Sequence, residues 1–140
     1  MCTKYIRGDG SCFYRAIALA VYGTQNNFQD IRTALATYFA SLTLQMWSQD
    51  QEILAVRGTF ENEKEFRAYK KKLLRDIRNP KIFAEEPVLL AVTRVFKMNV
   101  AVVSQFGAQP YALHQHDCGH DVTVCLLLKN DHFELLYKEA

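Results

Sequence analysis

Hydrophobic residues recur every three or four positions through much of residues 12–97, which is the spacing of one helix face. The repeat predicts helices over 12–22, 28–42, 62–78 and 86–97, while 48–57 has no clear pattern. Asn27 precedes the second helix as an expected N-cap, and Asn62 with Glu65 resembles a capping box at the start of the third. The fourth helix is apolar on nearly every side, so we expect it to be buried.

After residue 98 the hydrophobic period changes to two, which predicts strands. The expected strands cover 99–104, 110–115, 122–128 and 132–137. Segment 122–128 is apolar throughout and is therefore expected at the centre of the sheet. The polar run 114–121 is expected to form the tip of a hairpin. Helices followed by strands predict an α+β fold, with a mostly antiparallel sheet packed between helices.

The length and the charge of the chain argue against several classes of partner. A chain of 140 residues is expected to form a single domain over 1–140. The net charge of +2 is too small to favour nucleic acid, and the basic stretch 64–78 is interleaved with acidic residues, as on a solvated helix face. No apolar run approaches the roughly 20 residues that span a bilayer. We therefore expect neither a nucleic-acid partner nor a membrane partner. The chain is also expected to be a monomer.

The chain has four cysteines, which are too few and too scattered for a disulfide framework. They are Cys2, Cys12, Cys118 and Cys125. We expect free thiols in a reducing compartment such as the cytoplasm. Cys125 lies in an apolar strand and is expected to be inert core.

The sequence "GDGSCFYRAI", residues 8–17, places Cys12 between a flexible turn and the start of a helix. Taken alone, Cys12 could be a small core residue, a metal ligand or a nucleophile. A helix N-terminus stabilises a thiolate, because its unpaired N–H groups and dipole favour negative charge. The turn can also aim N–H groups at an oxyanion, which makes Asp9, Gly10, Ser11 and Cys12 a candidate oxyanion loop.

A nucleophilic cysteine also needs a base, and His132 at the start of the last predicted strand is the candidate. In a strand, residues i and i+2 lie on the same face. Glu134 is therefore expected to orient the imidazole, while Asp131 points the other way. Asp9 is either a turn or N-cap residue or a second candidate for the orienting carboxylate.

Three segments together resemble the ovarian tumour (OTU) family of cysteine proteases. "GDGSCFYRAI" is similar to its cysteine motif, "DHFELL" to its histidine motif, and "EEPVLLAVTRVFKMNVAVV", residues 85–103, to the helix-to-strand segment between them. The resemblance implies a papain-like fold, no cofactor or metal, and hydrolysis of isopeptide bonds at the C-terminus of ubiquitin. Carried over by position, Cys12 is the nucleophile, His132 the general base and Glu134 the orienting residue, with Asp9 in the oxyanion loop.

The chain departs from the family pattern in two places. Glu134 replaces the usual Asp or Asn, and "IFAEE" replaces an aromatic-Gly pair. Ubiquitin, polyubiquitin chains or ubiquitin-like modifiers are the expected partners. Glu85 and Glu86 are candidates for receiving the basic ubiquitin tail. The compact size suggests a viral or bacterial effector domain acting in the host cytosol.

Several alternatives remain open from the sequence. The chain could process a viral or retroelement polyprotein, or could bind ubiquitin without cleaving it. The metal-capable residues of 114–121 do not match a zinc pattern, so a polar turn is favoured there over a metal site. They are His114, His116, Cys118 and His120. Trp47 is expected in the core rather than at a ubiquitin-contacting surface.

Overall fold

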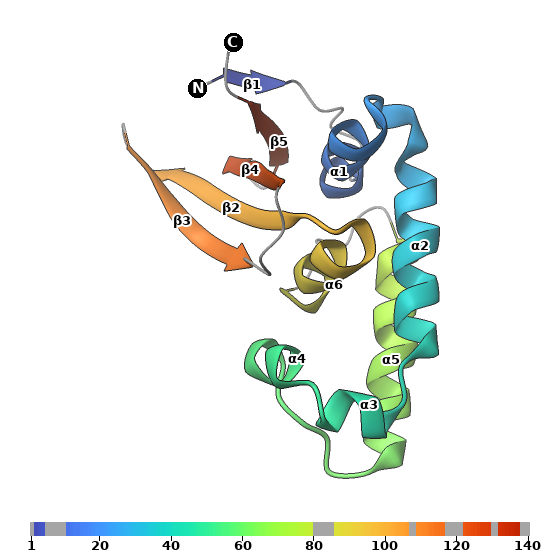
Figure 1. The fold of residues 1–140 in the computed structure, drawn as a ribbon. Helices are drawn as coiled ribbons and strands as arrows, with labels where there is room; N and C mark the ends of the chain where they lie inside the picture. Colours follow the sequence, from blue (N-terminus) through green and yellow to red (C-terminus); the bar gives the residue numbers. More distant parts are fainter. Residues whose placement is uncertain are drawn as a thin grey trace.

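The computed structural model describes residues 2–4, 11–79, 86–106, 109–116, 122–129 and 132–137 (Figure 1), with side chains described for 11–79, 86–103 and 122–127. Its helices are α1 (Cys12–Tyr22), α2 (Phe28–Ser41), α3 (Leu44–Ser48), α4 (Gln51–Val56), α5 (Glu63–Arg78) and α6 (Glu86–Phe96), with a 3-10 turn η1 (Gln25–Asn27) before α2. Its strands are β1 (Cys2–Lys4), β2 (Asn99–Phe106), β3 (Gln109–His116), β4 (Thr123–Lys129) and β5 (His132–Tyr137). The α+β class is confirmed.

The four predicted helices are confirmed to within one residue at each end. The ambiguous stretch 48–57 belongs to two short helices, α3 and α4. Each begins at a side chain that accepts a backbone N–H, with Thr43 Oγ1 bound to Met46 N at 3.1 Å and Asp50 Oδ1 bound to Ile53 N at 3.2 Å. Helices this short cannot repeat a hydrophobic period, so the pattern could not reveal them.

The sheet has the strand order β1-β5-β4-β2-β3. Strands β2 and β3 pair antiparallel, as do β4 with β5 and β1 with β5, whereas β2 and β4 pair parallel. The parallel pair follows from the hairpin before it. Strand β3 returns the chain to the start of β2, where His116 lies opposite Val100, and β4 begins again beside Asn99.

Strand β4 lies between β5 and β2, so its predicted central place is confirmed. The predicted hairpin tip at 114–121 is wrong, because β3 and β4 are not neighbours in the sheet. The apolar strand β4 has β5 and β2 as its two partners, and β3 takes the edge of the sheet beyond β2. Residues 117–121 themselves lie outside the described residues.

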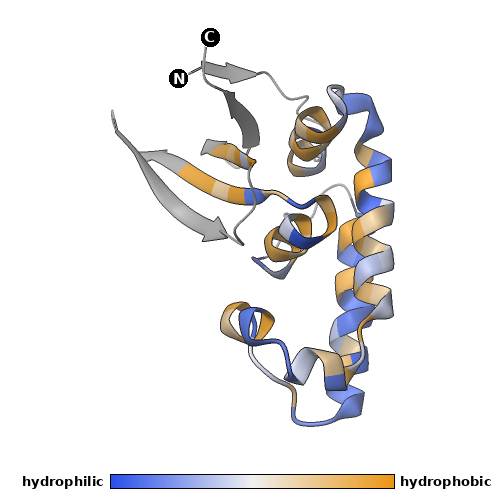
Figure 2. Ribbon diagram, viewed as in Figure 1, coloured by the Kyte–Doolittle hydropathy of each residue, from blue (hydrophilic) through white to orange (hydrophobic). Residues whose placement is uncertain are grey.

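One face of the sheet is covered by helices. Val100, Val102, Val124 and Leu126 are buried, whereas Ala101 and Val103, which alternate with the first two along β2, are only half-buried. Helix α6 packs against β2 and β3, and α1 against β4 and β5. The helices of the described chain gather on one side of the sheet (Figure 1), and the hydrophobic positions of α1, α2 and α6 turn toward this interior (Figure 2). The expectation of a sheet packed between helices is therefore wrong for the described residues.

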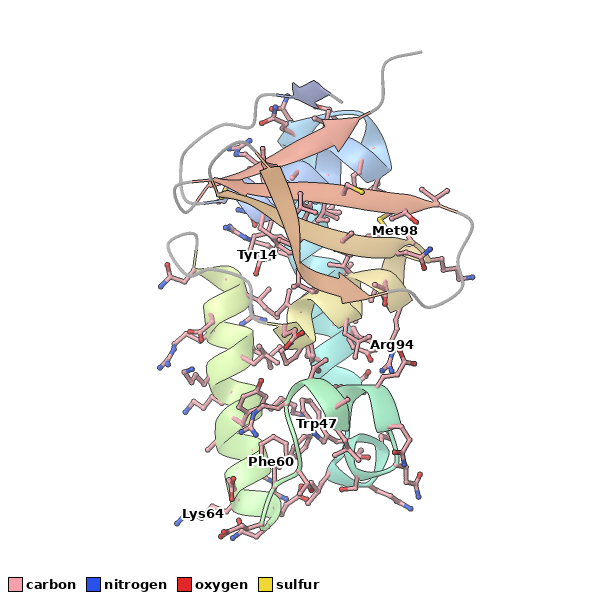
Figure 3. The ribbon with its side chains drawn as sticks, turned by 90° about the vertical axis from the view of Figure 1, so that its left-hand side faces the viewer. Tyr14, Trp47, Phe60, Lys64, Arg94 and Met98 are labelled. Carbon is pink, nitrogen blue, oxygen red and sulfur yellow. The ribbon has the colours of Figure 1, made fainter. Side chains whose placement is uncertain are left out.

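A cluster of aromatic side chains holds α3 against α5 at the end of the molecule away from the sheet (Figure 3). Trp47 is 2% exposed and meets Phe60, Phe66 and Tyr69 at ring-centroid distances of 5.3, 6.0 and 5.8 Å. Its indole N–H donates to the Gly58 carbonyl at 2.9 Å. The prediction that Trp47 is a core residue is confirmed.

No helix in the described ranges is long and apolar enough to cross a membrane.

Candidate active site

Cys12 is the first residue of α1, and its side chain is 4% exposed. The first turn of this helix carries no acidic residue, so no carboxylate of that turn competes for the positive end of the dipole. The helix continues to Tyr22 and ends at Gly23, whose φ of 77° gives a left-handed C-cap. Cys12 therefore lies at the end of the helix toward which the backbone N–H groups of the first turn point.

The described part of the expected oxyanion loop consists of Ser11 and Cys12. Ser11 stands at the N-cap position of α1, with its carbonyl accepting from Arg15 N at 2.9 Å. Its hydroxyl accepts a hydrogen bond from Arg32 Nη2 of α2 at 2.7 Å. The residue that precedes the cysteine is thus tied to a neighbouring helix. Asp9 and Gly10 lie outside the described residues.

Arg32 is only 4% exposed and lies close to two aromatic rings. Its guanidinium lies 4.8 Å from the ring centroid of Tyr14 and 5.2 Å from that of Phe28. Arg15 approaches the same Phe28 ring at 4.1 Å and donates to the Gln25 carbonyl at 3.4 Å. The two arginines therefore link the first turn of α1 to α2 and η1. Each guanidinium lies over an aromatic ring, whose face attracts a cation.

Tyr14 stays neutral in this setting. Burial raises the pKa of the Tyr14 phenol to about 12, and the charge of Arg32 opposes part of that rise. A phenol with this pKa remains protonated throughout the range in which proteins are folded. Tyr14 therefore acts as a neutral platform beneath Arg32.

The other half of the predicted site is carried by β5, against which α1 packs. The pairing of β5 with β4 is regular from Cys125–Leu136 to Lys129–His132, with Leu127 opposite Glu134. The predicted strand 132–137 is confirmed, and positions 132 and 134 share one face of it. The structure thus brings together the elements that carry Cys12 and His132. The catalytic roles of His132 and Glu134 stay predictions, because their side chains lie outside the described set.

The sequence model of the OTU-like cysteine protease family matches residues 7–134. That range runs from the turn ahead of Cys12 to Glu134. The chain belongs to the OTU-like cysteine protease family. The resemblance read from the three motifs is confirmed.

Solved OTU structures share this fold at low sequence identity. The viral OTU domain protease from Farallon virus superposes with a TM-score of 0.73 at 16% identity, covering 97% of this chain and 83% of the viral one. The OTU domain of OTUD1 gives 0.68 at 19% identity, covering 97% and 85%. An OTU deubiquitinase from Wolbachia pipientis wMel, solved bound to ubiquitin, gives 0.61 at 15% identity, covering 96% and 94%. No curated protein sequence matches the chain significantly.

The remaining predicted residues of this OTU domain are only partly described. Glu86 begins α6 and is half-buried, whereas Glu85 and Asp131 lie outside the described residues. Cys125 is a free, half-buried cysteine in β4 rather than fully buried core.

The metal-capable residues of 114–121 are split by the fold. His114 and His116 lie on β3, while Cys118 and His120 fall outside the described ranges. The described residues contain no group of three metal-capable side chains. The expected absence of a metal stays a prediction.

Arg32 is the residue of this site that sequence reasoning missed. It lies three residues before Leu35 and four before Ala36, which are both buried, so it is on the inward face of α2. A charged residue at an inward helical position was the available signal, because such a charge needs partners when buried.

Proposed function

We propose that residues 1–140 form one catalytic domain, a deubiquitinase that hydrolyses the isopeptide bond at the ubiquitin C-terminus. The observation that carries the proposal is the place of Cys12. It begins a helix that packs against the strand starting at His132, in a chain of the OTU-like cysteine protease family. Such an arrangement suits a thiol nucleophile with a base supplied from a separate element.

In the proposed reaction, His132 takes the Cys12 proton and the sulfur attacks the carbonyl of the ubiquitin C-terminal residue. N–H groups of the 9–12 loop stabilise the tetrahedral oxyanion. The imidazolium then protonates the leaving lysine amine, and the C–N bond breaks to give a thioester. Water, deprotonated by His132, attacks that thioester and releases ubiquitin and the thiol. Glu134 is assigned to orient the imidazole.

Ubiquitin is the proposed substrate because a protein of the same fold, the Wolbachia pipientis OTU deubiquitinase, was solved bound to ubiquitin. The ubiquitin tail is basic, and the acidic pair Glu85 and Glu86 is proposed to receive it. No step of this mechanism requires a metal or a cofactor.

The test combines a fluorogenic ubiquitin substrate with a ubiquitin that carries a C-terminal electrophile. The wild-type chain is expected to turn over the first and to form a covalent adduct at Cys12 with the second. Cys12→Ala should lose both reactions and still bind ubiquitin. Cys125→Ala is the matched control, since it removes another free thiol and should retain both.

Two other outcomes would overturn the proposal. Ubiquitin binding by the wild-type chain without an adduct would identify a silent ubiquitin-binding module. Cleavage of peptide substrates without any reaction at ubiquitin would identify a protease of another specificity, such as one that processes a polyprotein.

A further inference from the structure

Helix α5 accounts for the net positive charge of the chain. It holds seven basic and three acidic residues, a net charge of +4, so the other 124 residues sum to −2 within the overall +2. The interleaving of acidic and basic residues along the sequence predicted a solvated helix face. Around the helix, however, the two signs are separated.

Five basic residues form one stripe along the outer side of α5, which we call the basic stripe. They are spaced three or four residues apart, so at 3.6 residues per turn they fall within an arc of roughly 80° and extend over roughly 21 Å. All five are exposed, whereas Phe66, Leu73 and Ile77 on the other side of the helix are buried. The basic stripe consists of Lys64, Arg67, Lys71, Arg75 and Arg78.

The charges of the basic stripe are available to an external anion. Within the described part of the chain, the members that form no ion pair are Lys64, Lys71 and Arg78. Arg67 lies 3.4 Å from Glu63 and Arg75 lies 3.8 Å from Asp76, but these arginine side chains are 76% and 73% exposed. Water screens such exposed pairs, so both arginines can also interact with a partner.

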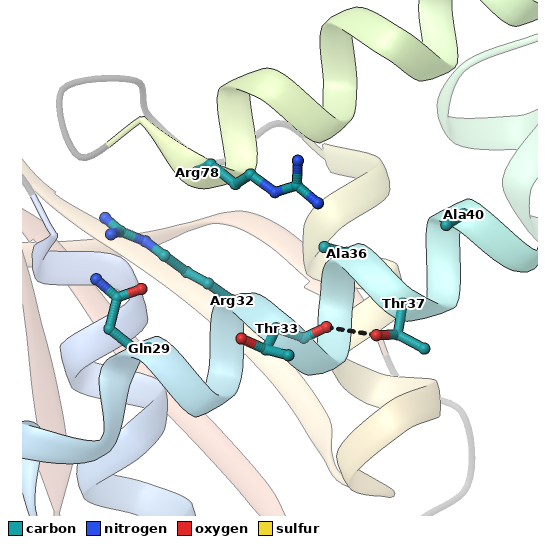
Figure 4. Close-up of a pocket in the computed structure, with 7 residues that line it drawn as sticks. All are labelled: Gln29, Arg32, Thr33, Ala36, Thr37, Ala40 and Arg78. Atoms are coloured by element: carbon teal, nitrogen blue, oxygen red, sulfur yellow. Dashed lines mark hydrogen bonds between the residues drawn. The ribbon is translucent and has the colours of Figure 1, made fainter.

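The basic stripe extends from the far end of the molecule toward the cysteine loop. Figure 3 shows Lys64 at the end of α5 that lies away from the sheet, directed outward. At the other end, Arg78 lines a hollow of about 390 Å³ together with Arg32 of α2 (Figure 4). Arg32 in turn binds Ser11, the residue before Cys12. A surface bound along the stripe would therefore lie beside the proposed active site.

We propose that the basic stripe docks this domain on an anionic lipid surface. A flat layer of negative headgroups meets a convex helix along one line, and the five cations lie on such a line. Clusters of four to eight basic residues on an amphipathic helix are typical of binding to anionic lipids, and each residue strengthens it about five-fold. Helix α5 exposes no large hydrophobic side chain, so the contact stays at the headgroups. Such docking needs no spanning helix.

Other polyanions fit the stripe less well. A helix in the major groove of a duplex has a phosphate backbone on each side, but Glu63 lies on one flank of the stripe and Glu65 and Asp76 lie on the other. Single strands are bound by stacking on aromatic rings, yet Phe66 is buried and Tyr69 half-buried. The centre of a protein interface needs aromatic or apolar anchors, which the exposed face of α5 does not supply.

The test measures co-sedimentation of the full chain with vesicles of phosphatidylcholine that contain about 30% phosphatidylserine, with pure phosphatidylcholine vesicles as the reference. Lys64→Gln/Lys71→Gln removes two charges from the stripe. Lys72→Gln/Lys97→Gln removes two exposed charges that lie off it and is the matched control. Both variants carry the same kind of substitution and the same net charge. Circular dichroism checks that they fold.

The wild-type chain is expected to bind the anionic vesicles at about 50 mM NaCl, to leave them by about 300 mM NaCl, and not to bind the neutral ones. Lys64→Gln/Lys71→Gln should bind about 30-fold more weakly, because two contributions of about five-fold are lost. The control should stay within about three-fold of wild type, since its charges do not face the headgroups.

Three outcomes would overturn the proposal. The first is no binding of the wild-type chain to the anionic vesicles, and the second is an equal loss in the two variants, which would reflect net charge alone. The third is stripe-dependent binding of duplex DNA or polyglutamate, measured by fluorescence anisotropy, without binding to vesicles. Sedimentation requires no catalysis, so the docking proposal and the proposed function can fail separately.

Discussion

The carboxylate that orients His132 is expected two positions along strand β5, at Glu134. The regular pairing of β5 with β4 puts positions 132 and 134 on the same face, while the odd position between them lies on the other. Glu has one more methylene than the Asp or Asn usual in the family, so its carboxylate extends farther from the strand. The alternation of side chains along the strand therefore favours Glu134 as the orienting residue, whereas its longer side chain makes the carboxylate a poorer fit to the imidazole.

Glu134→Ala is expected to lower kcat/KM by about ten- to a hundred-fold, equal to roughly 1.4 to 2.7 kcal/mol of transition-state stabilisation. The loss is smaller than that of the nucleophile or base because the proposed role of Glu134 is exerted only through His132, and a cysteine is a good nucleophile even beside a less well oriented base. Asp131→Ala should lose clearly less. Steady-state cleavage of a fluorogenic ubiquitin substrate, with circular dichroism to check folding, measures both.

Two outcomes would reassign the orienting residue. A larger loss in Asp131→Ala than in Glu134→Ala would contradict the parity argument. A loss in Asp9→Ala with neither of the others affected would transfer the role to the cysteine loop, giving a triad of Cys12, His132 and Asp9.

Among the helices, a single arginine joins α6 to α4 and α2. Arg94 Nη2 donates to Asp50 Oδ1 at 2.8 Å, Nη1 donates to Oδ2 of the same carboxylate, and Nη1 also donates to the Tyr38 hydroxyl at 3.0 Å. Asp50 is in turn the N-cap of α4. The hydrogen bond from Arg94 is the main reason that the pKa of Asp50 lies below its usual value.

Asp50→Asn is expected to reduce the free energy of unfolding by about 1 to 2 kcal/mol at pH 7, because it removes a bidentate ion pair and keeps a capping oxygen. Since the folded pKa is depressed, the contribution of the pair is complete above the unfolded pKa of about 4 and is lost as pH falls through the folded value. Urea unfolding of both proteins at pH 7 and at about pH 3 should show the difference shrinking in acid.

Glu52→Gln serves as the control for this pair. Its carboxylate lies 3.4 Å from Arg94, but its side chain is 59% exposed, so the loss should be smaller. If Asp50→Asn lowers the free energy of unfolding equally at both pH values, the effect comes from the packing of α4 rather than from the ion pair.

Helix boundaries were predictable wherever the chain supplies both a periodic face and a local start signal. At the start of α5, Asn62 Oδ1 accepts from Glu65 N at 2.9 Å, as the capping-box pattern predicted. The return bond differs, since Glu65 Oε2 accepts from Glu61 N at 3.2 Å rather than from Asn62. The hydrogen bond at the start of α5 leaves a local trace in the sequence, and this is why that boundary was found, whereas Asn27 at the N-cap position of α2 makes no such bond.

Features that depend on distant partners could not be predicted in the same way. Strand β1 has only three residues, and its partner β5 lies at the other end of the chain. The parallel pairing of β2 with β4 depends on the path of the whole sheet. The contact between Ser11 and Arg32 needs the relative placement of α1 and α2, although the inward position of Arg32 could be read from the helical repeat.

Across the whole molecule, the buried cluster runs from the aromatic group around Trp47, through α5, α2 and α6, to the sheet. Cys12 belongs to this cluster. The proposed nucleophile is therefore supported by the general packing of the domain, in addition to its own loop.

Because packing and backbone groups supply the proposed chemistry, chelators such as EDTA are expected to leave ubiquitin cleavage unchanged within about two-fold. The measurement is the fluorogenic assay before and after chelation, with metal analysis of the purified protein. A loss of activity that added zinc restores would contradict the metal-free mechanism and direct attention to residues 114–120. Loss of folding on chelation would instead indicate a structural metal.

Strand β5 is held on one side by β4 and on the other by β1, with Lys4 opposite Leu135 and Cys2 opposite Tyr137 (Figure 1). During synthesis β1 and Cys12 leave the ribosome early, whereas β5, with the proposed base, leaves last among the strands. A nascent chain therefore contains the proposed nucleophile before it contains the histidine that would activate it. Only when the final strand inserts between its two neighbours are both halves of the proposed active site in one domain, so the proposed activity requires closure of the sheet.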